Sequence, residues 1–494
     1  LQQTLEQIQK GGTYESKWGN YKFGTNKKKG KPYTNATSGA VVALDVKTGE
    51  VLALANYPAY DPNLFATGIS SADWASLFPE NEDDLLAPRP LYNIAIQTAI
   101  QPGSTFKMIT GLSALEKGLD PNKTIRDMGY IDIGIKRFGC WIWNSHRGTH
   151  GAENIYDALR DSCNYYFYSL VMGKNARTGE GLGMKVDIED IMAMAKEFGL
   201  NDKTGIEIDI PNESSGGVPN PAAKVASTKA MLKRYLKQNL ANYKKEDVKI
   251  SEAQLNKDID EITSWLELEE PLSRGEVIRR LDSMGFNPEV KVNGENKGLA
   301  DRIKFDYINQ AKWNIVDTLN ISIGQGENAY TPIQMANYIA TLANGGTRHK
   351  VSVVDNIKNY DNTEVIYETK DKGEKINISN FENLDHVKLG MRKVVSEGTA
   401  RSIFANFPVS VAAKTGTAQK SGYNPATGEK YDDFAWFVAF APYEEPEIAV
   451  AVVLFQGGSG GYAGPIARDI IAEYLGLNRD EQVEKLPFTT EFDR

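Results

Sequence analysis

Short apolar runs near the two ends of this 494-residue chain constrain its fold more than any other feature. Residues 41–44 and 51–54 are apolar and flank a turn that contains Gly49, which predicts a β-hairpin of two buried strands. Three more strand patterns occur only after residue 400, at 409–417, 434–441 and 448–455. Because buried backbone groups need hydrogen-bond partners, we expect one sheet that joins both ends of the chain.

The region between these strands is mainly helical by pattern. Predicted helices include residues 104–117 and 157–172, and a last helix at 465–475 follows the late strands. Residues 220–310 form a charged segment that we interpret as an insertion, for which a surface decoration and a partner-docking role both stay open. One helix face in this segment is marked by four apolar residues, Leu255, Ile259, Ile262 and Leu266.

Composition limits the kinds of partner that the chain can have. With 41% hydrophobic and 24% charged residues it can bury a sizeable core, and its net charge of −9 argues against a nucleic-acid partner. No apolar run approaches the 18 or so residues of a membrane helix. The sequence starts at Leu1 without a signal-peptide pattern, so composition alone leaves open a cytoplasmic protein or an anchor segment upstream.

Ser104 and Lys107 are the first candidates for catalysis. They stand three residues apart at the start of a predicted helix, so both side chains lie on one helix face. A serine hydroxyl becomes a good nucleophile only when a base removes its proton, and a neutral lysine amine can be that base. Burial, a second nearby cation and the positive end of the helix dipole all favour the neutral amine.

Two later motifs provide residues that could complete such a site. Ser162-Cys163-Asn164 is the only Ser-x-Asn in the chain. Lys414-Thr415-Gly416-Thr417 follows an apolar run and places a cation, two hydroxyls and a close-approach glycine on one predicted strand.

Taken in order, these three motifs resemble the active site of penicillin-binding proteins and serine β-lactamases. Other segments are similar to class B, elongation-type penicillin-binding proteins, and the resemblance covers about residues 36–475. Residues 1–35 are then the remnant of a larger N-terminal region, and 36–494 form the transpeptidase domain with its insertion. The segments that are similar to class B enzymes are 46–50, 57–63, Gly324-Gln325-Gly326, 331–336, 397–400 and 434–437. The resemblance implies an α+β fold, with an antiparallel sheet between helices and the active site at the edge that carries Lys414.

The resemblance also implies a role for each site residue. Ser104 would be acylated by a D-alanyl-D-alanine stem peptide while Lys107 takes its proton, and Ser162 and Lys414 would relay that proton to the departing D-alanine. Asn164 would hold the peptide part of the substrate, and Thr415 and Thr417, beside Gly416, would bind its carboxylate. Backbone N–H groups of Ser104 and Thr417 would form an oxyanion hole, and β-lactams would acylate the same serine.

The two cysteines of the chain, Cys140 and Cys163, enclose two of its four histidines, His146 and His150. Thiolate and imidazole ligands gathered in this way are typical of tetrahedral zinc, although the spacing is not that of a standard finger. A disulfide and two unlinked thiols are the alternatives that the residues leave open.

The family resemblance makes the metal hypothesis more specific. In elongation-type enzymes the similar region has an acidic residue before a glycine turn, a ligand before a Trp, a His-Gly pair and a Cys beside Ser-x-Asn. Here these correspond to Asp127, Cys140, His150 and Cys163, with His146 as a rival for one place. We expect a structural zinc ion, because four protein ligands leave no open position for water.

The resemblance finally implies partners and a location. Stem peptides and β-lactams would be ligands, a separate membrane glycosyltransferase would supply glycan, and the chain would lie on the outer face of the cytoplasmic membrane, anchored by an N-terminal helix that this fragment lacks. No organic cofactor is expected. The competing functions are a D,D-carboxypeptidase or β-lactamase, a β-lactam-sensing receptor and, more remotely, a metallohydrolase built on His146 and His150.

Overall fold

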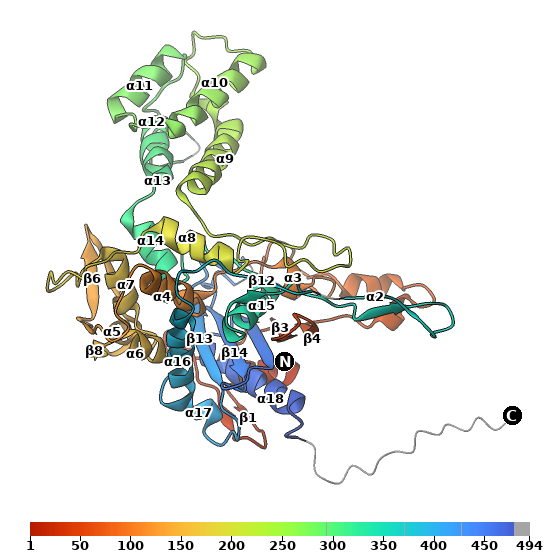
Figure 1. Ribbon diagram of the computed structural model, residues 1–494. Coiled ribbons are helices and arrows are strands. Elements are labelled where there is room, and N and C mark those ends of the chain that lie inside the picture. Colours follow the sequence, from red (N-terminus) through yellow and green to blue (C-terminus); the bar gives the residue numbers. More distant parts are fainter. Residues whose placement is uncertain (293, 370, 426, 479–494) are drawn as a thin grey trace. The chain divides into compact units, whose positions relative to one another are not determined.

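The computed structural model describes residues 1–292, 294–369, 371–425 and 427–478 (Figure 1). The chain divides into two compact units. Unit 1 combines Leu1–Val218 with Thr318–Arg494, and unit 2 is the continuous stretch Pro219–Asp317. The segment 220–310, interpreted above as an insertion, falls entirely within unit 2.

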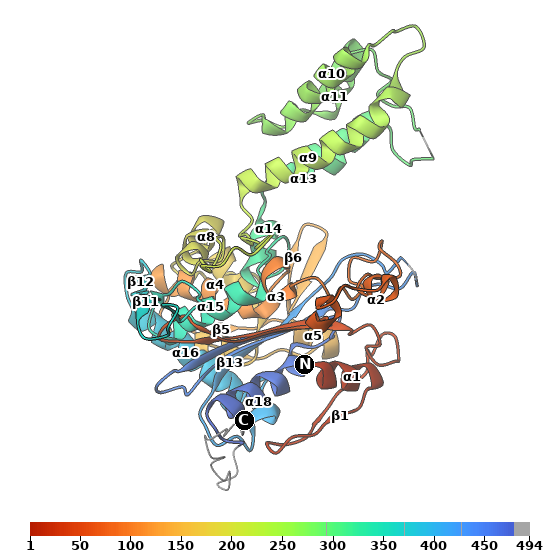
Figure 2. The ribbon, with the colours of Figure 1, turned by 90° about the vertical axis from the view of Figure 1, so that its right-hand side faces the viewer.

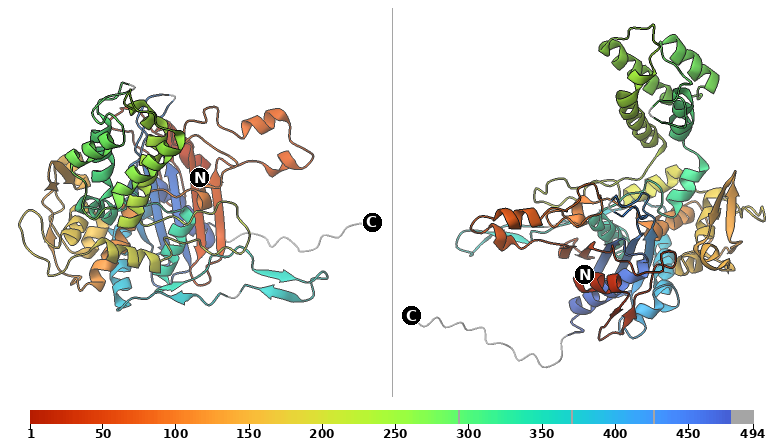
Figure 3. Two further views of the ribbon diagram at one scale, coloured as in Figure 1. Left: turned by 90° about the horizontal axis from the view of Figure 1, so that it is seen from above. Right: turned by 180° about the vertical axis from the view of Figure 1, so that it is seen from behind.

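Unit 1 is built on a five-stranded antiparallel sheet with the order β13-β14-β15-β3-β4. The strands are β3 (Ser38–Asp45), β4 (Val51–Tyr57), β13 (Ala412–Ala418), β14 (Phe434–Ala441) and β15 (Ile448–Phe455). Pairing of β3 with β15 sets Val41 opposite Val452, so the early hairpin and the late strands form one sheet (Figure 3). The expected α+β fold and its sheet joining both chain ends are confirmed.

Burial explains the order of the strands. Every residue of β14 and β15 is buried, as expected for apolar runs in the middle of a sheet that is covered on both faces. The early hairpin was expected to consist of two buried strands, but β4 is partly exposed because it forms an outer edge of the sheet. β13 forms the opposite edge.

Helices cover both faces of the sheet (Figure 2). On one face α15 (Pro332–Ala343), buried along its whole length, packs on β3, β14 and β15. On the other face α18 (Gly464–Tyr474) packs on β14 and β15, and α1 (Gln2–Lys10) adds Leu5 and Ile8 to the same apolar cluster. The sheet is therefore the middle layer of unit 1.

Unit 1 also contains further helices and several two-stranded pairs. The further helices are α2 (Ser71–Ser76), α3 (Ile94–Gln97), α4 (Lys107–Glu116), α5 (Trp141–His146), α6 (Ile155–Arg160), α7 (Asn164–Met172), α8 (Ile188–Glu197), α14 (Ile315–Ser322, which begins in unit 2), α16 (Glu382–Ser396) and α17 (Arg401–Phe404). Two-stranded pairs are β1 (Thr13–Tyr14) with β2 (Tyr21–Lys22), β5 (Ile125–Arg126) with β8 (Ala152–Glu153), β6 (Tyr130–Ile133) with β7 (Lys136–Gly139), β9 (Thr347–Arg348) with β12 (Glu374–Lys375), and β10 (Asn356–Lys358) with β11 (Val365–Glu368). In the described ranges, no helix is both long and apolar enough to cross a membrane.

Two predicted helices differ from the observed ones. The helix expected over 104–117 begins as a 3-10 helix, Gly103–Phe106, before α4 takes over at Lys107. The helix expected over 157–172 is interrupted between α6 and α7, because Ser162 has a left-handed backbone with φ of 56°. A single residue in this conformation cannot continue a right-handed helix. Both interruptions fall on candidate catalytic residues.

Unit 2 is a helical body with its own apolar core. It contains α9 (Pro221–Asn239), α10 (Glu252–Ser264), α11 (Arg274–Ser283), α12 (Leu299–Asp301), a π-helix (Arg302–Ile308) and α13 (Asn309–Ala311). Leu232, Ile259, Ile262, Trp265 and Leu281 meet in its core. Of the four residues that marked one helix face, Ile259 and Ile262 are buried on α10 and Leu255 is half-buried there, whereas Leu266 is buried in the 3-10 helix that follows, Trp265–Glu267.

Because unit 2 has a separate core, its stability should be separable from that of unit 1. Leu281 is fully buried, so Leu281→Ala should lower the stability of unit 2 by about 2–5 kcal/mol. Hydrogen exchange followed by mass spectrometry should then show faster exchange in α10 and α11 and unchanged exchange in β14 and β15. The control is Leu268→Ala, which truncates an exposed leucine of the same unit. Equal loss of protection in both units would contradict the prediction.

Candidate active site

The turn that carries Ser104 is a 3-10 helix, Gly103–Phe106, and Lys107 is the first residue of α4. In a 3-10 helix residues three positions apart eclipse each other, so Ser104 and Lys107 still project on the same side. The sequence had predicted this shared face from an α-helix. Ser104 is half-buried, whereas Lys107 is fully buried.

Lys107 is held by the Ser-x-Asn segment. Its Nζ donates to the Ser162 carbonyl oxygen at 2.7 Å and to Asn164 Oδ1 at 2.7 Å, and the Ser162 hydroxyl lies 3.2 Å away. Burial lowers the pKa of Lys107 to about 8. A neutral amine has two N–H groups for the two stronger acceptors and keeps a lone pair for a hydroxyl. The geometry therefore suits a lysine that acts as a base.

Ser162 and Asn164 reach Lys107 because the chain turns sharply between α6 and α7. Ser162 is 7% exposed and adopts a positive φ that non-glycine residues rarely have. Backbone strain of this kind persists only where the surroundings enforce it, and it is often found in functional sites. The predicted grouping of Ser162, Asn164 and Lys107 is thus present in the structure.

The edge strand β13 supplies the other side of the site. Lys414 is fully buried, and its Nζ donates to the Thr415 carbonyl oxygen at 3.1 Å. Burial, and then the charge of Lys107, lowers the pKa of Lys414 well below its ordinary value. Two lysines that repel each other in a desolvated site favour at least one neutral amine.

The main chain of Thr415 and Thr417 faces the open edge of the sheet. The carbonyl of Thr415 accepts from Lys414 Nζ and that of Thr417 accepts from Gln325 Nε2 at 3.1 Å, so neither points toward β14. The N–H and C=O of one strand residue point the same way, so both N–H groups also face the open edge. An extended peptide could pair with this edge.

Glycines allow β13 and the nucleophile turn to touch. A Cβ on Gly103, which has a φ of 56°, would lie 2.6 Å from the Thr417 carbonyl oxygen. A Cβ on Gly416 would lie 2.7 Å from the Pro102 carbonyl oxygen. Gly103, the residue before Ser104, therefore stands directly beside Thr417, the approach that an oxyanion hole made by the N–H groups of Ser104 and Thr417 requires.

The four residues expected to bind a metal also come together. One ligand atom from each of Asp127, Cys140, His150 and Cys163 lies within 4.8 Å of all the others. His150 Nδ1 is 3.0 Å from Asp127 Oδ2 and 3.5 Å from Cys140 Sγ, and the two sulfurs are 3.9 Å apart. Both cysteines are free, so the alternative of a disulfide does not describe this structure. His146 is exposed at the end of α5 and is not part of the group.

The charges in this cluster suit a cation. Burial opposes ionisation of the Cys140 thiol, but hydrogen bonds from Cys163 and His150 lower its pKa to about 5. Burial likewise opposes a charged His150, yet Asp127 and Cys140 raise its pKa to about 10. The negative charges of the Asp127 carboxylate and the Cys140 thiolate thus favour a positively charged group between them. The Asn164 N–H also points to Cys140 Sγ at 3.3 Å, which links the cluster to the Ser-x-Asn segment.

Three residues near the site were not assigned a role from sequence. Gln325 contacts Thr417, and Thr399 Oγ1 lies 3.0 Å from Thr415 Oγ1. Glu153, fully buried on β8, has a pKa raised to about 8 by burial. The family-like segments 324–326 and 397–400 contain Gln325 and Thr399 but did not predict a role for either residue. No spacing pattern singles out Glu153.

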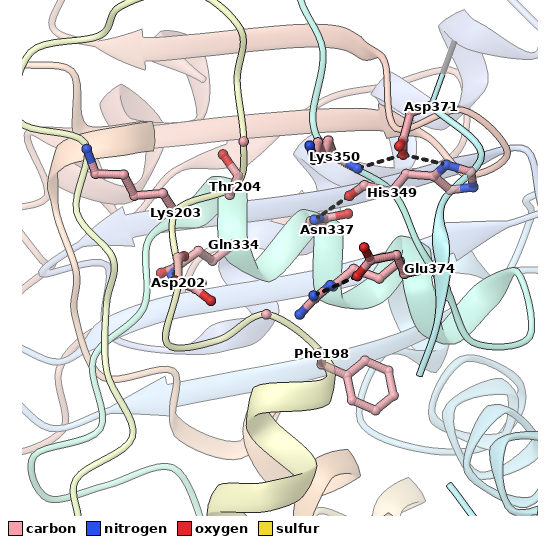
Figure 4. A pocket seen from close by; sticks show the side chains of 13 residues that line it. Phe198, Asp202, Lys203, Thr204, Gln334, Asn337, His349, Lys350, Asp371 and Glu374 are labelled. Carbon is pink, nitrogen blue, oxygen red and sulfur yellow. Dashed lines mark hydrogen bonds and ion pairs between the residues drawn. The ribbon is translucent and has the colours of Figure 1, made fainter. Parts of the chain in front are cut away.

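A separate cavity of about 150 Å³ lies near the first turns of α15 (Figure 4). Its walls include Phe198, Lys203, Asn337, His349 and Asp371, with His349 Nδ1 3.1 Å from Asp371 Oδ2. None of the candidate catalytic or metal-binding residues is among its lining residues. It is therefore distinct from the site described here.

Comparison with known proteins decides the family. Residues 39–244 and 283–472 match the penicillin binding protein transpeptidase domain, which is well over half of the chain. The chain belongs to the penicillin-binding protein transpeptidase family. Peptidoglycan D,D-transpeptidase MrdA of Acinetobacter baumannii is 29% identical to it over 452 residues, which cover 88% of this chain and 50% of that protein. The chain thus spans about half the length of the curated relatives it matches.

Solved structures of penicillin-binding proteins agree with this family. Pseudomonas aeruginosa PBP2 in complex with WCK 5153 is 26% identical with a TM-score of 0.60, and the match covers 90% of this chain and 76% of that chain. A peptidoglycan synthase complex that coordinates polymerization and crosslinking contains a chain 25% identical with a TM-score of 0.63, covering 98% of this chain and 61% of that one. The expected kinship with class B, elongation-type penicillin-binding proteins is confirmed.

The buried amine of Lys107 can be tested by titration. Because desolvation disfavours its charged form, we expect the ε-carbon resonance of Lys107 to titrate near pH 8, below the ordinary lysine value of 10.5. Protein labelled at lysine ε-carbons, with Lys107→Met to assign the signal, provides the measurement by NMR. A midpoint at or above pH 10 would show that the amine stays charged and is no base at neutral pH.

Proposed function

We propose that this chain is a serine D,D-transpeptidase that cross-links peptidoglycan stem peptides through an acyl-enzyme on Ser104. The observation that carries the proposal is the buried Lys107, which lies beside the nucleophile turn and keeps a lone pair available. A lysine must be neutral to accept a proton, and the lowered pKa of Lys107 makes a neutral amine accessible near physiological pH.

The proposed acylation step uses these groups as follows. Ser104 Oγ attacks the carbonyl carbon of the penultimate D-alanine, and its proton passes to Lys107 Nζ. The C–N bond to the terminal D-alanine breaks as that nitrogen receives a proton through Ser162 and Lys414. An amine of a neighbouring stem peptide then attacks the ester carbonyl. The new C–N bond forms as the bond to Ser104 Oγ breaks, and the proton lost by the amine passes through Lys107 to Ser104 Oγ. Bond formation and proton transfer balance without a cofactor.

The edge of β13 would hold the donor peptide. Backbone N–H groups of Ser104 and Thr417 would stabilise the negative oxygen of the tetrahedral intermediate, which carries its charge only near the transition state. Hydroxyls of Thr415 and Thr417 would bind the terminal carboxylate, and Asn164 would bind the peptide part of the donor. Binding along an open strand edge also explains why a β-lactam could occupy the same place.

The family relatives extend the proposal to partners and location. One similar chain belongs to a complex described as coordinating polymerization and crosslinking, so we propose that a membrane glycosyltransferase supplies the glycan strands here. Stem peptides are assembled into the wall outside the cytoplasmic membrane. We therefore place the protein on the outer face of that membrane, held there by an N-terminal anchor.

We further propose a structural zinc ion at Asp127, Cys140, His150 and Cys163. Two sulfurs, one imidazole nitrogen and one carboxylate oxygen are ligands that zinc prefers. Three of their separations are 3.0, 3.5 and 3.9 Å and all lie within 4.8 Å, which suits a tetrahedral centre. A bound ion would hold Cys163 and, through the Asn164 N–H on Cys140 Sγ, would fix the residues that contact Lys107.

The acyl-enzyme provides the decisive test of the proposed function. Incubation with a β-lactam should add one drug mass to the native chain, and Ser104→Ala should remove the adduct because no other residue carries the nucleophile. Intact-mass spectrometry gives the measurement, with Ser76→Ala, an exposed serine on α2, as the matched control. An adduct that persists in Ser104→Ala would overturn the proposal.

Product assays with the same protein distinguish cross-linking from hydrolysis. Given a D-alanyl-D-alanine pentapeptide and an acceptor amine, a transpeptidase forms the amide product, whereas a carboxypeptidase forms only the shortened peptide. Rapid release of a hydrolysed β-lactam would instead indicate a β-lactamase. A stable adduct without turnover of any peptide would favour the β-lactam-sensing receptor.

The zinc proposal predicts a metal-bound chain. Native protein should carry about one zinc ion, and His150→Ala should lose most of it, because a tetrahedral site with three protein ligands binds the ion more weakly. Zinc content by elemental mass spectrometry and the thiolate bands of the cobalt-substituted protein are the two readouts. The control is His146→Ala, which alters an exposed histidine. A native chain that binds neither zinc nor cobalt would disprove the site.

A further inference from the structure

The loop that follows α14 packs against the nucleophile turn. The Gly103 N–H donates to the Gly324 carbonyl oxygen at 3.0 Å. Gly324 has a φ of 72°, and a Cβ there would lie 2.0 Å from the Gly103 carbonyl oxygen, so no other residue fits. The position of Gln325 is therefore fixed relative to Ser104 by direct backbone contact.

The side chain of Gln325 reaches across to the edge of β13. Its Nε2 donates to the Thr417 carbonyl oxygen at 3.1 Å, and its Oε1 accepts from the Gln419 N–H at 3.3 Å. One amide thus pairs with the edge through both a donor and an acceptor, as a neighbouring strand would. The Gln325 side chain therefore limits the open edge of β13 at its Thr417 end.

This bridge connects the two halves of the proposed oxyanion hole. One N–H belongs to Ser104 on the 3-10 helix and the other to Thr417 on β13, two segments that meet only by packing. The backbone link between Gly103 and Gly324 holds the first segment, and the side chain of Gln325 holds the second. A carbonyl oxygen has two lone pairs, so Thr417 can accept from Gln325 and still pair with a bound peptide.

We propose that Gln325 is a positioning residue for acyl transfer: it holds the Thr417 carbonyl and so the main chain of Thr417, which keeps the Thr417 N–H aligned with that of Ser104. This inference rests on the proposed function, because it assigns a role within the same site. Gln325 contacts no reacting atom. It acts through Thr417, and its effect should therefore appear in the acylation step rather than in the binding of the reagent.

Stopped-flow acylation by a β-lactam separates these two quantities. Gln325→Ala should lower the limiting acylation rate constant by about 10- to 100-fold, less than the loss caused by removing an oxyanion donor outright. The concentration at half-saturation and the pH midpoint should not change, since Lys107 keeps its surroundings. Thermal unfolding of the variant should match that of the control below.

The chain offers a matched control in Gln97. Its Nε2 donates to the Pro211 carbonyl oxygen at 2.8 Å and its Oε1 accepts from the Asn93 N–H at 3.0 Å, a bridge of the same kind away from the site. Gln97→Ala should acylate at the native rate. Gln325→Glu keeps an acceptor for Gln419 but presents a carboxylate oxygen to the Thr417 carbonyl, and it should lose at least as much rate as Gln325→Ala.

Each outcome decides the inference. A native limiting rate in either Gln325 variant would overturn it, and so would faster acylation or a lower half-saturation concentration, which would mean that the amide competes with the reagent. A loss seen only as weaker binding would also overturn it. If the native chain forms no adduct on Ser104, the proposed function itself fails. If the native chain is acylated and Gln325→Ala is acylated at the same rate, only this inference is refuted.

Discussion

The hydrogen bonds between β3 and β15 are the interaction on which the rest of the structure depends. They join residues 38–45 to residues 448–455 and so close a sheet whose strands come from the two ends of the chain. The nucleophile turn, the Ser-x-Asn segment and unit 2 all lie in the stretch of chain between β4 and β13, outside this sheet. The site exists because the nucleophile turn, Gly103–Phe106, packs against the edge strand β13 of this sheet.

The sequence predicted those parts that depend on local pattern. Apolar runs located β14 and β15 to the residue, because strands buried on both faces have no exposed positions to interrupt the pattern. The motifs also predicted Ser162 and Asn164, which the structure groups around Lys107. The cysteine-rich region likewise predicted Asp127 and His150, which lie beside the two cysteines. The left-handed Ser162 and the 3-10 start of α4 were missed, because both conformations are enforced by contacts with distant segments. Gln325 had no predicted role, since its partners lie more than 90 residues away.

The candidate metal cluster and the catalytic groups share one short segment. Cys163 lies between Ser162 and Asn164, and Asn164 points its backbone N–H to Cys140. A buried lysine needs acceptors held in place, because a small shift would leave its N–H groups without partners in a site that excludes water. The cluster therefore bears on the chemistry of Ser104 without touching it.

The open edge of β13 has a consequence for how such a protein can evolve. The groups that would recognise a peptide there are the N–H and C=O of Thr415 and Thr417, and every amino acid except proline carries the same pair. Substitution cannot easily remove them. Under the proposed function, changes in β-lactam sensitivity would then arise mainly from side chains that support the strand from outside, so escape from the inhibitor would be gradual and would draw on residues remote from the inhibitor itself.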